Sequence, residues 1–187
     1  MAFATRHVFI AGLGNLPYPA TRHSVGQLVI DALAMRLGIR MQSDRGGFSG
    51  QGNVYIGETS VHVTLYKSKS LMNISGPSIV KAFRQTVPGN QPTSLIVLTD
   101  SLSHRPSTLS VKLGGSAEGH NGVKSIISAM GGEAGFYRFR LGIGRDQSSD
   151  AANYVLKPLS SFERRFWVEE GLDLVLKEVE KVAKKAG

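Results

Sequence analysis

The stretch Ser94-Leu-Ile-Val-Leu-Thr-Asp100 decides the fold class, because it is the clearest strand in the chain. It is a short apolar run, partly β-branched, that ends at a carboxylate, and such a run favours a buried strand. A second run, His7-Val-Phe-Ile-Ala-Gly-Leu13, has the same apolar character and includes a glycine near its end. We therefore expect two buried strands, one near the start of the chain and one near its middle.

The segments around these two runs alternate between strand and helix patterns. Further strands are expected at Gly52–Gly57, Val61–Tyr66, Thr108–Leu113 and Tyr137–Ile143, the first two joined as a hairpin through Glu58 and Thr59. Helices are expected at Ser24–Leu37, Ser75–Gln85, Gly122–Met130 and Ser160–Lys185, with Ser24 as an N-cap and Gly38 ending the first helix. The polar stretch Gly144–Asp150 is expected to form a surface loop.

This alternation predicts an α/β fold, a single-domain mixed β-sheet sandwiched by helices, and not an all-β fold or a helical bundle. At 187 residues the chain fits one domain, and no internal repeat or linker divides residues 1–187. In such folds functional groups collect in the loops beyond the carboxyl ends of the strands. These loops are therefore the expected position of the site.

The composition narrows the classes of chemistry and of partner. The chain has no cysteine, which excludes disulfides, thiolate nucleophiles and cysteine-based zinc sites. Its net charge of +8, with a pI near 9.9, favours a polyanionic partner, nucleic acid first and an anionic membrane surface second. On charge alone, an inert basic surface is an equal alternative.

Nothing in the sequence predicts a membrane segment. The longest apolar run, Val8 to Leu13, is far shorter than the ~20 residues that a membrane span needs. A signal peptide is not expected either, because no small-residue cleavage site follows a long apolar stretch. We expect a cytoplasmic monomer, with the mitochondrial matrix or a plastid as the alternative location if a transit peptide has been removed.

Polar side chains occur at the expected strand ends and helix starts. They are Asn15, His23, Met72-Asn73, Asp100 and His120-Asn121. Each has an unremarkable explanation when taken singly, since asparagine and aspartate are common in caps and turns and a lone histidine often has no role. Only their combination points to chemistry.

Together these residues suit the attack of water on an acyl group. Histidine is the side chain whose ordinary pKa, ~6.5, makes it a general base near neutral pH. A carboxylate such as Asp100 can fix its tautomer, and asparagine amides can grip a peptide backbone or an oxyanion. The sequence has no G-x-S-x-G elbow and no HExxH motif, so neither a serine nucleophile nor a metal site is expected. Gly12-Leu13-Gly14 does not make a dinucleotide loop, because Pro17 takes the place of the third glycine.

A set of motifs, in order and spacing, resembles the bacterial-type peptidyl-tRNA hydrolase family. The motifs are Gly12-Leu-Gly-Asn15, Thr21-Arg-His23, Leu71-Met-Asn-Ile-Ser-Gly76, Asp100-x-Leu102, Lys112-Leu-Gly-Gly115, Gly119-His-Asn-Gly-Val-Lys124 and Arg138-x-Arg-Leu-Gly-Ile-Gly144. The resemblance implies hydrolysis of the ester between tRNA and a peptide or N-blocked aminoacyl group, which recycles tRNA from stalled translation. It implies that peptidyl-tRNA is the partner and that no metal or cofactor is needed.

The resemblance also implies a role for each matching residue. His23 would be the base that activates water, Asp100 would orient it, and Asn15 would position the water or the ester carbonyl. Asn73 and Asn121 would hold the peptide main chain, in a groove lined by Met72 and flanked by Tyr18. Lys112 and Arg140 would bind tRNA phosphate, with Lys124 and Arg138 as further candidates.

Some positions depart from the family pattern. Leu16-Pro17 is shorter than the usual loop, Ser24 replaces the usual asparagine, and Glu118 stands in the glycine-rich loop where a small residue is common. The main alternative is a non-catalytic RNA-binding relative that acts as a partner in organellar intron splicing. That reading predicts lost catalytic groups or a large exposed apolar patch. A small-molecule α/β enzyme, such as a nucleotide hydrolase, is a further alternative, but the sequence has no phosphate-binding loop.

Overall fold

The computed structural model describes residues 6–147 and 150–185, and in this part of the chain seven strands form one sheet in the order β2-β3-β4-β1-β5-β7-β6. The strands are β1 (Arg6–Gly12), β2 (Gln42–Ser43), β3 (Gly47–Ile56), β4 (Thr59–Ser68), β5 (Leu95–Ser101), β6 (Leu109–Leu113) and β7 (Tyr137–Gly142). The helices are α1 (Val25–Leu37), α2 (Gly76–Thr86), α3 (Asn121–Ala129), α4 (Ala151–Val155), α5 (Ser161–Val168) and α6 (Glu170–Lys185). Of the 3₁₀ turns, η1 (Arg22–Ser24) and η2 (Met72–Ile74) contribute to the site.

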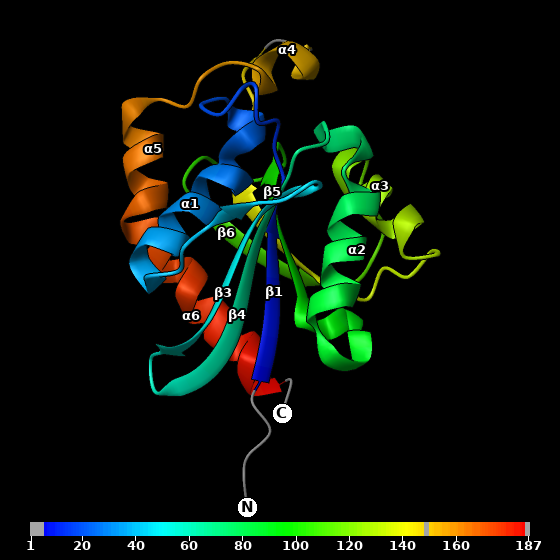
Figure 1. The fold of residues 1–187 in the computed structure, drawn as a ribbon. Helices are drawn as coiled ribbons and strands as arrows, with labels where there is room; N and C mark the ends of the chain where they lie inside the picture. Colours follow the sequence, from blue (N-terminus) through cyan, green and yellow to red (C-terminus); the bar gives the residue numbers. More distant parts are fainter. Residues whose placement is uncertain (1–5, 148–149, 186–187) are drawn as a thin grey trace, which may run out of the picture.

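Helices cover both faces of the sheet, as the sequence predicts. Helices α1, α5 and α6 lie on one face, and α2 and α3 lie on the other (Figure 1). Each face of the sheet has its own hydrophobic core, and strand β1 contributes to both. Val8 and Ile10 pack beneath the first group of helices, whereas Phe9 and Ala11 pack beneath the second. Such a continuous apolar run is typical of a strand that is buried on both faces.

The pairing of the strands determines where a ligand can bind. Strands β4, β1, β5 and β7 are parallel to their neighbours in this group, whereas β2, β3 and β6 add antiparallel edges. After β1 the chain continues to β2, β3 and β4 on one side of the sheet, and after β5 it continues to β6 and β7 on the other. The connections diverge beyond the carboxyl ends of β1 and β5, which is where open α/β sheets bind ligands.

Most of the predicted elements are confirmed, with longer strands in the hairpin. Strands β3 and β4 extend beyond the expected ranges, because their outer residues continue to pair up to Gly47 and Ser68. The helix predicted from Ser160 to Lys185 is wrong as a single element. It breaks at Glu169, where φ is −118° and ψ is −97°, into α5 and α6.

Two short elements were not predicted. The strand β2 and the helix α4 had no apolar pattern to predict them, and α4 is instead capped by Asp150, which accepts a hydrogen bond from the Asn153 N–H at 3.0 Å. The start of the predicted surface loop Gly144–Asp150 is confirmed, while residues 148–149 lie outside the described residues. None of the helices described here has the length and apolar character needed to cross a membrane.

Two glycines set how closely α1 approaches the sheet. A Cβ atom at Gly26 would lie 2.4 Å from the Leu98 carbonyl oxygen, and a Cβ atom at Gly12 would lie 2.3 Å from the Gly26 carbonyl oxygen. Only glycine fits such a backbone contact without displacing the helix. The close approach brings the start of α1, and the turn η1 before it, against the end of β5.

Candidate active site

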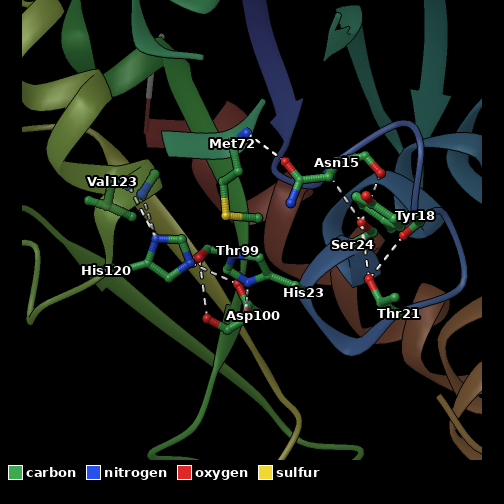
Figure 2. Close-up of polar contacts among 11 residues, drawn as sticks. Asn15, Tyr18, Thr21, His23, Ser24, Met72, Thr99, Asp100, His120 and Val123 are labelled. Carbon is green, nitrogen blue, oxygen red and sulfur yellow. Dashed lines mark hydrogen bonds and ion pairs between the residues drawn. The ribbon is translucent and has the colours of Figure 1, made fainter. Parts of the chain in front are cut away.

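His23 and Asp100 come from distant parts of the chain and meet at this edge of the sheet. His23 lies in η1, immediately before α1, and Asp100 is the penultimate residue of β5. The Nδ1 atom of His23 lies 2.8 Å from Oδ2 of Asp100 (Figure 2). The carboxylate side chain is only 3% exposed, whereas the imidazole is 20% exposed and can reach a ligand.

A second histidine, His120, completes the arrangement. Its Nε2 atom lies 2.7 Å from the other carboxylate oxygen of Asp100, Oδ1. Its Nδ1 atom accepts hydrogen bonds from the N–H groups of Gly122 and Val123 at 3.1 and 3.2 Å, so it caps the start of α3. The position of His120 in the loop before α3 was predicted from the sequence. Its contacts were not predicted, because a histidine side chain is an unusual N-cap.

These contacts fix which ring nitrogen carries the proton. Because Nδ1 of His120 accepts from backbone N–H groups, the proton of the neutral ring must lie on Nε2, which donates to Asp100. The remaining oxygen of the carboxylate accepts from Nδ1 of His23. The neutral His23 ring therefore carries its proton on Nδ1 and presents an unprotonated Nε2, the form that a general base requires.

The same contacts shift the pKa values of both groups. Burial by itself would raise the pKa of Asp100, but the hydrogen bonds from His120 and His23 lower it to about 2. Burial lowers the pKa of His23, yet the hydrogen bond to Asp100 and the charge of its carboxylate outweigh burial and raise the pKa above 6.5. Asp100 is thus ionised at neutral pH and stabilises the imidazolium that forms when His23 takes a proton.

Asn15 is held rigidly beside the histidine. Its side-chain Oδ1 accepts a hydrogen bond from the Met72 N–H at 2.7 Å, which leaves the amide Nδ2 as a free donor group. Its own backbone N–H donates to the Ser24 hydroxyl at 2.9 Å. Ser24 is fully buried, so this residue, which differs from the family pattern, directly supports the Asn15 loop. Figure 2 shows Asn15, Met72 and His23 around one space.

The other residues proposed to contact the peptide differ in exposure. Met72 is 1% exposed and forms part of the floor, since its Cγ atom lies where a side chain on Gly122 would otherwise be. Asn73 is exposed in η2, and Asn121 is exposed as the first residue of α3. Tyr18 is 56% exposed, and its backbone N–H donates to the Asn15 carbonyl at 2.8 Å, which closes a tight turn despite the shortened loop.

His23, Asp100 and His120 are also residue types that bind metals. Their candidate ligand atoms all lie within 4.8 Å of one another, although the residues are too far apart in the sequence to form a motif. Each histidine nitrogen, however, is directed at a different oxygen of the same carboxylate, at a hydrogen-bond distance. Hydrogen bonds therefore account for the close contacts within this cluster.

Comparison with known proteins agrees with this geometry. Residues 9–186 match the family described as peptidyl-tRNA hydrolase. The chain belongs to the peptidyl-tRNA hydrolase family. It is 35% identical over 162 residues to a peptidyl-tRNA hydrolase of Thermodesulfovibrio yellowstonii, which covers 84% of this chain and 82% of that protein. It is 40% identical over 161 residues to one of Geobacter sulfurreducens, with 82% and 78% covered.

The fold is shared with solved structures of the family. A crystal structure of peptidyl-tRNA hydrolase from Acinetobacter baumannii superimposes with a TM-score of 0.82 at 29% sequence identity, covering 99% of this chain and 92% of that one. The α/β fold predicted from the sequence, with a mixed sheet between helices, is therefore the fold of the peptidyl-tRNA hydrolase family.

The cationic residues singled out by the resemblance lie on the other side of β5. Lys112 of β6 and Arg140 of β7 both contact the carboxylate of Glu118, through Lys112 Nζ and through Arg140 Nη1 at 3.4 Å. Arg140 also donates through Nη2 to the Ser110 hydroxyl at 2.8 Å. These four residues form a cluster, which we call the Glu118 cluster.

Lys124 and Arg138 differ sharply in exposure. Lys124 is exposed on α3 and is free to reach a ligand. Arg138 is 2% exposed, and its guanidinium donates to the carbonyl oxygens of Gly115 and Ser116. A phosphate contact does not fit this position, because the guanidinium is already used to hold the glycine-rich loop against β7.

Proposed function

We propose that the protein hydrolyses the ester that joins tRNA to a peptide or N-blocked aminoacyl group, with His23 as the general base. The hydrogen bond of 2.8 Å between His23 Nδ1 and Asp100 Oδ2 carries this proposal, because it leaves Nε2 of a neutral ring available to a water molecule. Family membership indicates the substrate, and the arrangement of the side chains supplies the chemistry.

In the proposed reaction, Nε2 of His23 takes a proton from water while the water oxygen attacks the ester carbonyl carbon. The carbonyl oxygen becomes an oxyanion, and the side-chain Nδ2 of Asn15 donates a hydrogen bond either to it or to the attacking water. The tetrahedral intermediate then collapses, the bond to the ribose oxygen of tRNA breaks, and His23 returns the proton to that oxygen. Asp100 remains ionised throughout and stabilises the imidazolium.

The peptide would lie between η2 and the start of α3. Asn73 and Asn121 are exposed there, and amide side chains can pair with both the N–H and the C=O groups of a peptide main chain. Leu71 and Ile74 are 54% and 64% exposed beside Asn73, so they offer apolar surface to peptide side chains. Recognition of the main chain suits an enzyme that must accept many peptide sequences.

The tRNA would be bound through its phosphates by Lys112 and Arg140, with Lys124 as a further contact. Phosphate contacts are independent of sequence, which an enzyme acting on many tRNAs requires. Arg140 lies on β7, which pairs with β5, Lys112 lies on the neighbouring strand β6, and Lys124 lies on α3, whose first turn is capped by the His120 side chain that contacts Asp100. The net charge of +8 supports a polyanionic partner.

Because this chemistry needs only water and protein groups, the enzyme would act without a metal or cofactor. It would act as a monomer in the cytoplasm, where peptidyl-tRNA arises. The alternative, an RNA-binding relative without activity, is disfavoured because His23, Asp100, Asn15, Asn73 and Asn121 are all present.

The deciding experiment is the incubation of wild type and His23→Ala with a purified N-blocked aminoacyl-tRNA. The variant should lose about 10²–10⁴-fold in kcat, the usual contribution of a general base, while its Kd for tRNA stays near that of wild type. Binding of tRNA without hydrolysis by the wild type would favour the splicing-partner alternative. Near-normal turnover by His23→Ala would remove His23 from the role.

A further inference from the structure

The glycine-rich loop places a carboxylate against the two cationic side chains proposed to bind tRNA phosphate. One oxygen of Glu118 accepts from Lys112 Nζ, and the other lies 3.4 Å from Arg140 Nη1. Arg140 is further tied to Ser110. The carboxylate thus has a lysine and an arginine around its two oxygens, as a phosphate group bound at the same position would have.

Glu118 is not required by the conformation of its loop. Its φ angle is +52°, a left-handed conformation that side chains rarely adopt, and Gly114, Gly115 and Gly119 around it also have positive φ angles. Glycine would adopt this conformation without strain. The side chain of Glu118 is therefore explained by its ion pairs and not by the backbone.

The charge of Glu118 persists under the conditions in which the enzyme works. The hydrogen bond from Lys112 is the main cause that lowers the pKa of Glu118, and the charges of Lys112 and Arg140 lower it further. The side chain is 46% exposed, so it can rotate away from the two cations without disturbing the core. It is both a stable anion and a displaceable one.

We infer that Glu118 is an internal competitor of tRNA phosphate, which occupies the phosphate site formed by Lys112, Arg140 and Ser110 until the substrate displaces it. This inference rests on the proposed function, since it assigns these residues to phosphate. Binding of each phosphate at this site then costs the breaking of the Glu118 contacts, and the displaced carboxylate still repels the RNA. Glu118 weakens tRNA affinity and favours release of the tRNA product.

The test measures the Kd for deacylated tRNA at low salt, together with KM and kcat for an N-blocked aminoacyl-tRNA. Glu118→Gln removes the charge and keeps the size, and Glu118→Gly also removes the conformational strain. Both should bind tRNA about twofold to fivefold more tightly, the effect expected for one exposed charge pair, and KM should fall in parallel. Because charge repulsion is screened, the gain should shrink as the salt concentration rises.

Two controls separate this effect from a general change in charge. Glu58 is exposed in the turn between β3 and β4, at the opposite end of the sheet, so Glu58→Gln makes the same charge change away from the site and should leave Kd unchanged. In a Lys112→Ala, Arg140→Ala background, Glu118→Gln should gain little, because the phosphate site is no longer there.

The outcomes distinguish this inference from the proposed function. If both Glu118 variants bind tRNA as weakly as wild type, or more weakly, while wild type still hydrolyses its substrate, the competitor role is wrong and the hydrolase remains. If wild type neither binds nor hydrolyses the substrate, the proposed function itself fails. Circular dichroism melting checks each variant for folding, and Glu118→Gly provides the result if the glutamine variant does not fold.

Discussion

The molecule has two ionic clusters near the loop between β6 and α3, one around Asp100 and one around Glu118, and they differ in almost every physical respect. In the first, Asp100 is 3% exposed and each of its oxygens accepts a hydrogen bond from a histidine at 2.7 or 2.8 Å. In the Glu118 cluster the carboxylate is 46% exposed and one of its contacts is as long as 3.4 Å. Burial makes the first cluster rigid and insensitive to salt, whereas exposure makes the second displaceable and strongly screened.

This contrast suggests a division of work between the clusters. The buried cluster holds a base in one tautomer, which chemistry requires, and gains nothing from mobility. The exposed cluster must release its internal partner to accept a phosphate and then release the phosphate again. Changes in the buried cluster should therefore alter kcat and the pH profile, and changes in the exposed cluster should alter binding and its dependence on salt.

The largest effect is expected for Asp100→Asn. An amide offers one acceptor and one donor group, so it cannot accept from both His23 Nδ1 and His120 Nε2. His23 then loses the tautomer that exposes its unprotonated Nε2, and kcat should fall by about 10³–10⁴-fold. Single-turnover kinetics with saturating enzyme measure this loss. A fall of less than tenfold would show that the carboxylate does not control the base.

The pH dependence of kcat/KM tests the same cluster without a mutation. His23 acts as a neutral base, and its pKa is raised above 6.5. The rate should be maximal above this raised pKa and should fall about tenfold per pH unit as the pH drops below it. In Asp100→Asn the remaining profile should shift to lower pH, because the carboxylate that raises the pKa is gone. A rate that is flat from acid to neutral pH would contradict the assignment.

A smaller effect is expected for His120→Ala, which tests a positioning residue. The substitution leaves one oxygen of the buried Asp100 unpaired and removes the cap of α3, at a cost of roughly 1–3 kcal/mol in the free energy of unfolding. The pKa of Asp100 should rise, and kcat should drop about tenfold as His23 becomes less well oriented. Urea denaturation and the acid limb of the pH profile measure the two effects. An unchanged pH profile would indicate a merely structural role.

The smallest effect is expected in the exposed cluster. Lys112→Ala or Arg140→Ala should weaken tRNA binding several-fold and reduce the slope of log Kd against log salt by about one, with kcat unchanged. Lys124→Ala should do the same if Lys124 also contacts phosphate. Arg138→Ala should instead lower the stability of the loop, because Arg138 is buried against Gly115 and Ser116. Equal salt slopes for wild type and Lys112→Ala would place the RNA on another surface.

The buried cluster was also the more predictable of the two. Asn15 follows the apolar strand β1 and Asp100 lies near the end of the apolar strand β5, and a parallel sheet brings the carboxyl ends of these strands to one edge. Asn15, His23 and Asp100 could therefore be grouped from the sequence. The role of His120 as the second partner of Asp100 could not be predicted. Nothing in the residues around His120 indicates that its side chain both caps α3 and reaches Asp100 on β5.

The remaining errors have a common cause, which is that the spacing of apolar residues predicts burial and not contacts. Arg138 and Arg140 are two residues apart on β7 and therefore share one face of the sheet. Arg138 is nevertheless buried beneath the glycine-rich loop, whereas Arg140 contacts Glu118. The apolar spacing continues through Glu169, so it could not reveal the break between α5 and α6. Just after the break, Gly171 allows the close approach of Phe166, because a Cβ atom there would lie 2.7 Å from the Phe166 ring.

The glycine at position 26 links the packing of the molecule to its catalysis. Its hydrogen atom faces the Leu98 carbonyl oxygen two residues before Asp100, and it lies three residues after His23. A methyl group there would push the start of the first helix away from the sheet, and we expect the imidazole of His23 to move away from the carboxylate of Asp100. We therefore expect the geometry of the His23–Asp100 pair to depend on a glycine that lies outside the proposed contacts with the substrate.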